Sequence, residues 1–586
     1  MHYTKRVISL AIGFALVLSL FSGCEFSSDS KNLPDTNKSG KNDSKYEEFL
    51  TVDVFSTQAN YQGIQSGWFG KIVEDKFNMK LNIIAPNVSG TGDRLFQTRA
   101  AAGNLADIVM ISAENGRLEE AVEAGLLLDL STYMHLMPNA MQYSSAIETM
   151  QNLLGIDDKI YAIPSAVSTF SPMTPTETTE PSYGPYLRWD LYMAIGAPKM
   201  STLEDLLPVL KKMQMNTPFS DSGLKTYAFS LFSDWDNNLM MFAKQPACFY
   251  GYDEVGFTLN KADGTDTVSI LEDDSPYIRS LKFYFQANRM GLVDPESRTQ
   301  NWDNMVKKYE DGAVLFSPWA WLGQPAYNTM ERLNAGKGFM MAPVDDLEIF
   351  SYGATPQGTK FVVGVGSNTQ DPERMIEFID WLYSPEGVMM STSQEGSTSG
   401  PEGLTWKMDN DRPVLTSFGI TAMLDNGTEM PEEWGGGSWG IGTSQLNFTT
   451  VIPKDINPNT GFPYDFKLWE SYQEFTMTPV HKSWQMFMGA SSTLEYLEEK
   501  NQYIVAPGTD YYAPAETTEI STLRAKCKAI IVDTSWQMVF ASDETEFNRL
   551  LDSMQRRVKE LGYETVLAFD IQTANKLNEA RDKARE

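Results

Sequence analysis

The stretch Ala313-Val-Leu-Phe-Ser-Pro-Trp-Ala-Trp-Leu-Gly323 sets our expectation for the fold. Its first four residues are apolar and partly β-branched, which predicts a short buried strand that ends at Ser317-Pro318, because proline has no N–H for the ladder. Trp319 and Trp321 follow just past this strand end, where ligands collect in open α/β sheets. An indole there offers a flat apolar face to a sugar ring or another planar ligand. The alternative is core packing, which we expect for Trp321.

Strands and helices alternate along the preceding part of the chain. Hydrophobic spacing predicts strands at 49–56, 79–84 and 106–112, and helices at 68–77, 93–102 and 118–124. This alternation indicates an α/β fold with a parallel, doubly wound sheet. At 586 residues the chain is too long for one simple core, so we expect about two to four domains or lobes.

The N-terminus has the features of an export signal. Basic residues precede an apolar run from Val7 to Phe21, which is long enough for a signal peptide but short for a membrane span of about twenty residues. The run ends in LFSGC at 20–24, which resembles the bacterial lipoprotein signal and implies lipidation of Cys24. We therefore expect a signal peptide at 1–23 and a flexible polar tether at 24–48. An ordinary secretory signal is the alternative.

The charge balance and the few cysteines argue against several classes of function. A net charge of −30 repels nucleic acid and anionic lipid and disfavours strongly acidic substrates. Cys248 and Cys527 are the cysteines after position 24, and the sequence leaves open whether they pair. Without a Cys-x-x-Cys motif and with few histidines, we expect no zinc site and no cofactor. No Asp or Glu stands in an apolar frame that would suggest a raised pKa, so we expect no enzyme.

The order of several short segments resembles the extracellular solute-binding proteins of bacterial ABC importers. More closely, it resembles the carbohydrate-type family 1 that includes the maltose-binding protein and LipO-like lipoproteins. The segments are AAGNLADIV at 101–109, GLLLDL at 125–130, DDKIYAIP at 157–164, YLRWDL at 186–191, FSPWAWLG at 316–323 and FVVGV at 361–365. The resemblance implies an α/β, type II periplasmic-binding-protein fold, in which two hinged lobes enclose a ligand cleft. It places lobe 1 at 49–167 and 344–400, and lobe 2 at 168–343 and 401–586.

The resemblance also implies which residues bind the ligand. Trp319 stands where the family has a stacking tryptophan. Asp234, Trp235 and Asp236 stand where carbohydrate-binding members have an acidic and aromatic pair lining the cleft. Further candidates are Glu114, Asn115, Gln58 and Asn60, which follow expected strands, and Trp434 and Trp439, which lie in a glycine-rich loop.

Some relatives carry an EF-hand-like calcium loop after the first helix of the second lobe. The corresponding residues 216–225 contain one carboxylate, Asp221, and the positively charged Lys225. Calcium takes six to eight oxygen ligands, several of them anionic. We therefore expect no calcium and no other metal in this protein.

Taken with the lipoprotein signal, the resemblance implies a monomeric binding protein anchored on the outer face of a bacterial cell membrane. It would capture an oligosaccharide, perform no chemistry and deliver the ligand to the permease subunits of an ABC importer. A binder of polyamines or peptides is an alternative, because acidic charge and aromatic rings suit a polyamine. A secreted glycan-active enzyme is another, and it would need a carboxylate pair about 5–10 Å apart. A surface adhesin or sensor is the third.

Overall fold

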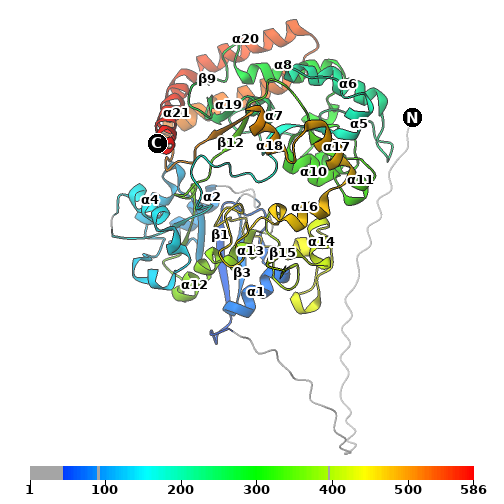
Figure 1. The fold of residues 1–586 in the computed structure, drawn as a ribbon. Helices are drawn as coiled ribbons and strands as arrows, with labels where there is room; N and C mark the ends of the chain where they lie inside the picture. The colour runs from blue at the N-terminus through cyan, green and yellow to red at the C-terminus, as the bar shows by residue number, and fades with distance from the viewer. Residues whose placement is uncertain (1–43, 87, 89–92, 157, 393–395) are drawn as a thin grey trace, which may run out of the picture. The chain divides into compact units, whose positions relative to one another are not determined.

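The computed structural model describes residues 44–86, 88, 93–156, 158–392 and 396–586 (Figure 1). The expected signal peptide, the lipidation site Cys24 and most of the expected tether lie outside the described residues. The described residues Ser44–Glu586 form one compact unit. In this part of the chain, no helix is long and apolar enough to cross a membrane.

The first lobe is built on a mixed sheet with the strand order β2-β3-β1-β4-β13-β5. Strand β1 pairs in parallel with β3 and β4, whereas β13 is antiparallel to β4. The strands of this lobe are β1 (Leu50–Ser56), β2 (Gly63–Ile64), β3 (Met79–Ile84), β4 (Ile108–Ser112), β5 (Ile163–Pro164), β13 (Phe361–Val365), β14 (Trp406–Asp409) and β15 (Arg412–Leu415). Its helices are α1 (Gly67–Phe77), α2 (Asp93–Ala101), α3 (Arg117–Glu123), α4 (Ser144–Leu154), α12 (Pro372–Tyr383), α13 (Pro385–Ser391), α14 (Ser417–Leu424), α15 (Trp439–Gly442) and α16 (Glu470–Thr476). The strands and helices that we predicted before residue 125 are confirmed.

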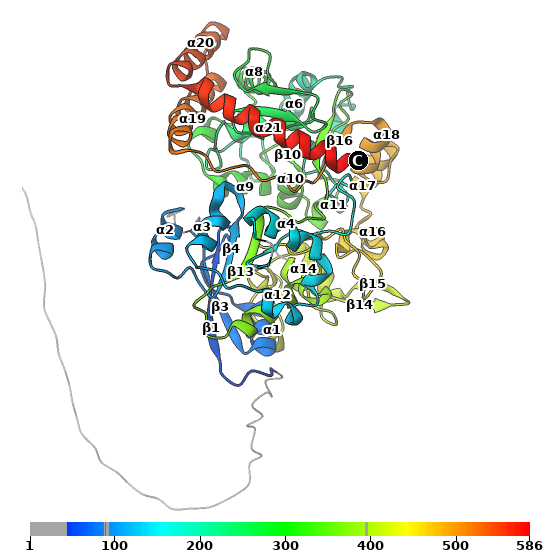
Figure 2. The same ribbon diagram turned by 90° about the vertical axis from the view of Figure 1, so that its left-hand side faces the viewer.

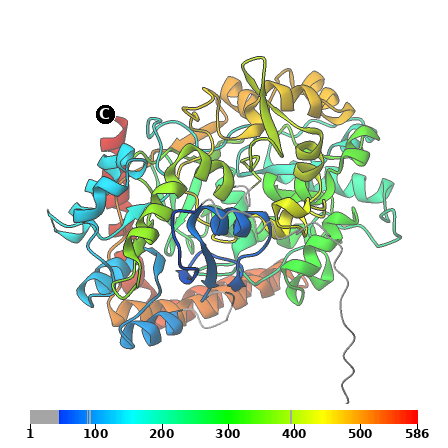
Figure 3. The same ribbon diagram turned by 90° about the horizontal axis from the view of Figure 1, so that it is seen from below.

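Side chains of β1 alternate between the two faces of this sheet, as the period of a strand requires. Val54 points into the core that α1 and α12 cover, where Phe77 packs edge-on against Phe378 with ring centroids 5.4 Å apart. Phe55 points into the opposite core and lies 6.1 Å from Phe96 of α2. Figure 2 shows α2 and α3 beside β4, and Figure 3 shows from below the yellow-green α12 beside the blue α1.

The second lobe packs its helices around smaller sheets with the orders β10-β6-β11 and β7-β8-β9, and around the parallel pair β12-β16. Its strands are β6 (Tyr183–Arg188), β7 (Tyr252–Val255), β8 (Thr258–Lys261), β9 (Thr267–Ser269), β10 (Phe316–Trp319), β11 (Phe339–Met341), β12 (Ile349–Tyr352) and β16 (Tyr503–Ala506). Its helices are α5 (Trp189–Ala194), α6 (Leu206–Asn216), α7 (Met241–Cys248), α8 (Pro276–Arg289), α9 (Trp302–Glu310), α10 (Ala320–Tyr327), α11 (Met330–Asn334), α17 (Pro479–Met488), α18 (Thr493–Lys500), α19 (Thr518–Val539), α20 (Glu544–Glu560) and α21 (Tyr563–Arg585). Helix α19, the third from the C-terminus, contributes to the same core as α8.

The strand that we expected to end before Ser317-Pro318 includes both residues. Strand β10 pairs with β6 alone, at the edge of its sheet, and its register shifts between Ser317 and Trp319. Proline is tolerated at an edge or a bulge because no partner there requires its missing N–H. The predicted strand end was therefore wrong by a few residues, and Trp319 is the last residue of the strand rather than part of a following loop.

The chain is divided between the lobes differently from our expectation. Ile349 still packs in the core of the second lobe, although we placed the return to the first lobe at residue 344. Of residues 401–586, which we assigned to the second lobe, Trp406 and Trp469 pack in the core of the first lobe, and Val480 is already in the core of the second. The predicted boundary was wrong because apolar residues in irregular segments do not indicate which of two cores they join.

The segments that connect the lobes touch at the level of the backbone. Gly353 N donates to Ala506 O at 2.7 Å, and Gly508 N donates to Pro172 O at 3.1 Å. A Cβ atom on Gly353 would lie 1.9 Å from Pro172 O, and one on Gly508 would lie 1.9 Å from Ala354 O. Close approach of backbones, rather than backbone conformation, therefore requires glycine at both positions.

We expect Gly353→Ala to destabilise the protein by about 3 kcal/mol or more, because the added methyl group meets a backbone oxygen that no side-chain rotation can move away. Differential scanning fluorimetry measures the effect as a lower midpoint of thermal unfolding. Gly103→Ala is the matched control, since nothing lies within 4 Å of its Cβ position and its left-handed backbone costs only about 1–2 kcal/mol. Equal shifts for the two variants would contradict the proposed contact.

Candidate functional site: an aromatic platform

Trp235, Trp302, Trp319 and Trp321 form a cluster in the second lobe, which we call the aromatic platform. Trp235 stacks on Trp302 with ring centroids 4.4 Å apart and planes inclined by 24°, and Trp319 stacks on Trp321 at 4.7 Å and 22°. The two pairs meet where Trp235 lies 6.2 Å from Trp321. Trp235 is 46% exposed and Trp321 is 45% exposed, whereas Trp319 is 2% exposed. The platform therefore presents two indole rings to solvent.

Trp319 is buried and Trp321 is exposed, the reverse of what we expected. Trp319 is the last residue of β10 and belongs to the buried layer of the platform, and helix α10 begins at the next residue. From that start, Leu322 and Gly323 turn into the core and Trp321 turns outward. The prediction that Trp321 is a core residue was wrong, and the helical period counted from Ala320 would have corrected it.

Trp319 is held in place from helix α7. Its indole Nε1 donates to Gln245 Oε1 at 2.8 Å, and its ring lies 5.5 Å from that of Phe242. Gln245 is 3% exposed, so this hydrogen bond is shielded from water. The lower layer of the platform is thus fixed in orientation, and Trp321 rests on it. Neither Gln245 nor Trp302 was identified from the sequence, where each is an isolated residue near a helix.

The predicted Asp234-Trp235-Asp236 group forms a braced loop. Asp234 is exposed, and its Oδ2 accepts the backbone N–H of Trp302 at 3.0 Å. Asp236 uses both oxygens within the protein, because Oδ1 accepts Met241 N–H at 2.8 Å and Oδ2 accepts Trp536 Nε1–H at 2.7 Å. Burial raises the pKa of Asp236 to about 6, and the two hydrogen bonds oppose that rise. In this arrangement Asp236 supports the loop, and its predicted contact with ligand stays a prediction.

Polar side chains continue from the platform along β6. Trp319 is paired in register with Tyr183 across the sheet. The hydroxyl of Tyr352 lies within hydrogen-bonding reach of Tyr183 and donates to Asp253. Asp253 in turn forms an ion pair with Lys244 at 2.5 Å. Burial lowers the pKa of Lys244, but the attraction of Asp253 outweighs it and the net shift is upward. No sequence pattern indicates this group, since its members come from separate elements.

The candidates of the first lobe follow its central parallel strands. Glu114 and Asn115 share a 3-10 turn directly after β4, and Glu114 pairs with Lys360 at 3.0 Å. Gln58, which is half-buried, and Asn60, which is exposed, follow β1. Because β1 and β4 are adjacent and parallel, these residues lie at the same edge of the sheet.

The tryptophans of the glycine-rich loop belong to the first lobe, beside α1. Trp439 is 3% exposed and stacks on Trp68 with ring centroids 4.9 Å apart and planes inclined by 9°. The prediction that Trp439 contacts ligand was therefore wrong, because its ring fills the core. Trp434 is half-buried and packs partly against the same core. In Figure 1, α1 lies at the lower end of the first lobe, whereas α10 of the platform lies in the second lobe.

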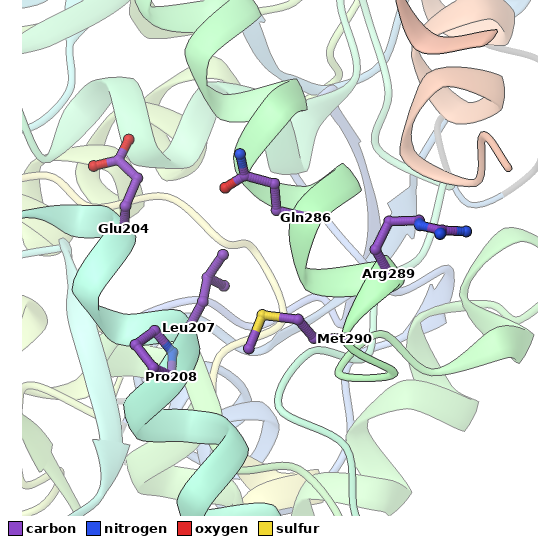
Figure 4. A pocket seen from close by; sticks show the side chains of 6 residues that line it. All are labelled: Glu204, Leu207, Pro208, Gln286, Arg289 and Met290. Carbon is purple, nitrogen blue, oxygen red and sulfur yellow. The ribbon is translucent and has the colours of Figure 1, made fainter. Parts of the chain in front are cut away.

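Two other features bear on ligands. A hollow of about 360 Å³ lies between α6 and α8, and none of its lining residues belongs to the platform. It is lined by Glu204, Leu207, Pro208, Gln286, Arg289 and Met290 (Figure 4). In the loop at 216–225, Asp221 is exposed and pairs with Lys337 at 3.4 Å, and it is the one carboxylate among residues for which calcium would need several anionic oxygens. Within the described ranges, no group of three or more His, Cys, Asp or Glu side chains is arranged to hold a metal ion. Cys248 and Cys527 are buried and unbridged.

A shielded carboxyl group lies under helix α10 of the platform. Glu180, in the segment that enters the second lobe, accepts the Tyr186 hydroxyl at 3.1 Å and also a hydrogen bond from Gln324 of α10. Burial raises the pKa of Glu180 to about 7, although these hydrogen bonds favour the charged form. The site thus contains a carboxyl group that titrates near neutral pH.

Comparison with known proteins agrees with this architecture. The sequence model of bacterial extracellular solute-binding proteins matches residues 71–401. Similar solved structures include an HMO-binding, ABC-transporter-associated solute-binding protein from Bifidobacterium longum infantis (14% identity, 90% of this chain and 99% of that chain covered, TM-score 0.56). They also include the alginate-binding protein AlgQ2 without calcium ion (15%, 92% and 99%, 0.57) and the S. pneumoniae substrate-binding protein FusA in complex with kestose (14%, 90% and 99%, 0.55). No curated protein sequence matches the chain. At these identities the likeness concerns the fold, and the predicted two-lobe α/β fold is confirmed.

We expect Glu180→Gln to flatten the pH dependence of stability. The pKa of Glu180 rises from 4.5 to about 7 on folding, so the folded protein binds more protons between these values and its stability falls as pH rises through them. Glutamine still accepts the Tyr186 hydroxyl but does not ionise. The variant should therefore gain stability relative to the wild type from pH 5 to pH 8, by up to about 3 kcal/mol.

Urea unfolding at several pH values measures this difference, with Glu433→Gln as a control for the loss of a surface carboxylate. A difference between Glu180→Gln and wild type that stays constant from pH 5 to pH 8 would show that the carboxyl group does not titrate in this range.

Proposed function

Because the chain belongs to the family of bacterial extracellular solute-binding proteins, we propose that it captures an oligosaccharide between its lobes and delivers it to an ABC importer. The observation that carries this proposal is the aromatic platform, in which Trp235 and Trp321 are both nearly half exposed although tryptophan is usually buried. An exposed pair of indoles supported by a buried layer is suited to stacking against the apolar faces of sugar rings.

The arrangement supports binding because little has to be ordered when a ligand arrives. Each indole has two rotatable side-chain bonds, and stacking on Trp302 and Trp319 restricts both exposed rings before binding. Order that is established during folding does not weaken affinity for the ligand. We infer that Trp235 and Trp321 are the stacking residues, and that Trp319 acts from below them rather than by direct contact.

Polar groups supply the hydrogen bonds that a sugar requires. We propose that Asp234 and the Lys244–Asp253 pair bind hydroxyl groups from the second lobe. From the first lobe we propose Glu114, with Asn115, Gln58 and Asn60 beside it. Each ligand hydroxyl left unpaired in a closed site costs about 1–3 kcal/mol, so closure of the lobes is favoured by a ligand that satisfies both sides.

The ligand that these residues suit best is uncharged. The chain carries a net charge of −30. The charged side chains described beside the platform are Asp234, Asp236 and the Lys244–Asp253 ion pair. A uronic-acid oligomer would meet Asp234 and Glu114, and the repulsion between like charges would weaken its binding. We therefore propose a neutral oligosaccharide and no reaction on it.

The same charge makes a polyamine the second candidate. Trp235 and Asp234 place an indole face beside an exposed carboxylate, and such a pair attracts an organic cation. A peptide, or a catalytic role on a glycan, has no comparable observation in its favour.

The remaining parts of the proposal concern location. We propose that lipidation of Cys24 anchors the protein to the outer face of the cell membrane, since two or three acyl chains hold a protein stably. The lipid-anchored protein would then act as a monomer beside its permease.

We expect neutral oligosaccharides to raise the midpoint of thermal unfolding of residues 44–586, because a ligand at a hundred times its Kd adds about 2.7 kcal/mol of stability. In the same screen, spermidine, peptides and uronic-acid oligomers should have smaller effects. If spermidine alone stabilises the protein, the result would favour the alternative that it binds polyamines. Release of reducing ends from the glycans would indicate an enzyme.

We expect Trp321→Ala and Trp235→Ala each to weaken binding of the stabilising glycan by about thirtyfold, which corresponds to about 2 kcal/mol for a central aromatic contact. Isothermal titration calorimetry measures the change. Phe219→Ala, which removes a ring that is 60% exposed outside the platform, is the matched control. Platform variants that bind as tightly as Phe219→Ala would exclude the platform as the sugar site.

A further inference from the structure

One carboxylate connects the loop that carries Trp235 to helix α19, which lies near the C-terminal end of the chain. Asp236 Oδ2 accepts the indole N–H of Trp536 at 2.7 Å, and Oδ1 accepts Met241 N–H, the first backbone donor of α7, at 2.8 Å. Trp536 is 4% exposed. A single side chain therefore joins α19, the platform loop and the start of α7.

A second connection runs from α19 to the same end of α7. Met240 N donates to the Tyr277 hydroxyl at 3.0 Å, so the hydroxyl proton is free to be donated to Ser535 Oγ, 2.8 Å away. Tyr277 and Ser535 are both fully buried. Helix α7 has no side-chain N-cap of its own, and the first backbone N–H groups of a helix need partners. Asp236 accepts the N–H of Met241 and the Tyr277 hydroxyl accepts that of Met240. Both acceptors are in turn hydrogen-bonded to side chains of α19.

Helix α7 carries this support to the other half of the platform. Gln245, about one turn along the helix, accepts the indole N–H of Trp319 at 2.8 Å. Trp235 is adjacent in sequence to Asp236, and Trp319 is reached through Gln245. Both tryptophan pairs of the platform therefore depend on the position of the first turn of α7.

We propose that Asp236 and Trp536 are positioning residues through which helix α19 fixes the aromatic platform for ligand. This inference rests on the proposed function only in taking an oligosaccharide as the ligand. The support of the platform by α19 is independent of it. Helix α19 lies outside residues 71–401, the part that matches the family. A segment beyond that region thus determines how the platform is presented.

The platform depends on these bonds because the donor of one of them is shielded from water: Trp536 is 4% exposed, whereas Asp236 is half-buried. Removing the Trp536 N–H leaves a carboxylate oxygen without its buried donor, and an unsatisfied buried group is costly. The loop then relaxes toward solvent, and Trp235 with it. Packing of α19 itself relies on Ile531, Met538 and Val539 in the lobe core, so the helix remains folded in a Trp536→Phe variant.

Trp536→Phe tests the proposal, with Trp484→Phe as the matched control. Trp484 is equally buried at 1% exposure and donates its indole N–H to a backbone oxygen, Met341 O, at 2.9 Å. Both variants lose one indole and one shielded hydrogen bond, but Trp536 alone is bonded to the platform loop. A difference between the two variants in hydrogen exchange or in affinity for the glycan therefore reports on the positioning of the platform loop.

In the ligand-free protein, we expect amide hydrogen exchange of residues 233–241 to be faster in Trp536→Phe than in wild type, and unchanged in Trp484→Phe. With the glycan that stabilises the wild type, Trp536→Phe should bind about tenfold more weakly, and Trp484→Phe within twofold of wild type. Asp236→Asn should weaken binding similarly. The side-chain NH2 of asparagine is a donor, so it would face either the N–H of Met241 or that of Trp536 and could not accept from it. The double variant should lose no more than either single variant.

Unchanged exchange of residues 233–241 in Trp536→Phe, or equal affinity of the two tryptophan variants, would overturn the inference. The two proposals fail in distinguishable ways. If no glycan stabilises the wild type, the proposed function fails, while the exchange measurement still decides whether α19 supports the loop.

Discussion

Contact between backbones where the chain passes between the lobes constrains the rest of this structure. Gly353 and Gly508 bring the connecting segments so close that a single methyl group on either would overlap a carbonyl oxygen. Strand β12 and strand β16 lead into these positions from the second lobe as a parallel pair. Because this contact leaves no space, the lobes are joined by adjacent segments with defined register rather than by independent linkers.

The platform follows a related principle, in which exposed rings are held by buried partners. Trp235 and Trp321 face solvent, and each rests on another indole whose position is fixed by a shielded hydrogen bond or by a helix start. Exposed aromatic side chains on an unsupported loop would lose conformational freedom when a ligand binds. In this protein that ordering takes place during folding, through contacts that extend from α7 to helix α19.

The general fold could be predicted from the sequence because it depends on regular patterns. The strand and helix alternation before residue 125 indicated the sheet of the first lobe, and Trp235 was recognised beside its acidic neighbours. The side-chain directions of Trp319 and Trp321 were assigned the wrong way round, since the edge position of β10 lets the strand continue through Pro318. Trp406, Trp439 and Trp469 were assigned to the second lobe but pack in the core of the first, because composition shows that a tryptophan is buried but not which core it fills. The link between Asp236 and Trp536 spans 300 residues, and no local pattern reports it.

The state of the two cysteines has a practical consequence. Cys248 and Cys527 are buried and unbridged, and burial raises the pKa of both thiols, so the reactive thiolate is scarce at neutral pH. Maleimides and similar reagents attack the exposed thiolate. Residues 44–586 can thus accept a pair of fluorophores at two newly introduced surface cysteines, one in each lobe, without removal of either native one, which makes distances between the lobes open to single-molecule measurement.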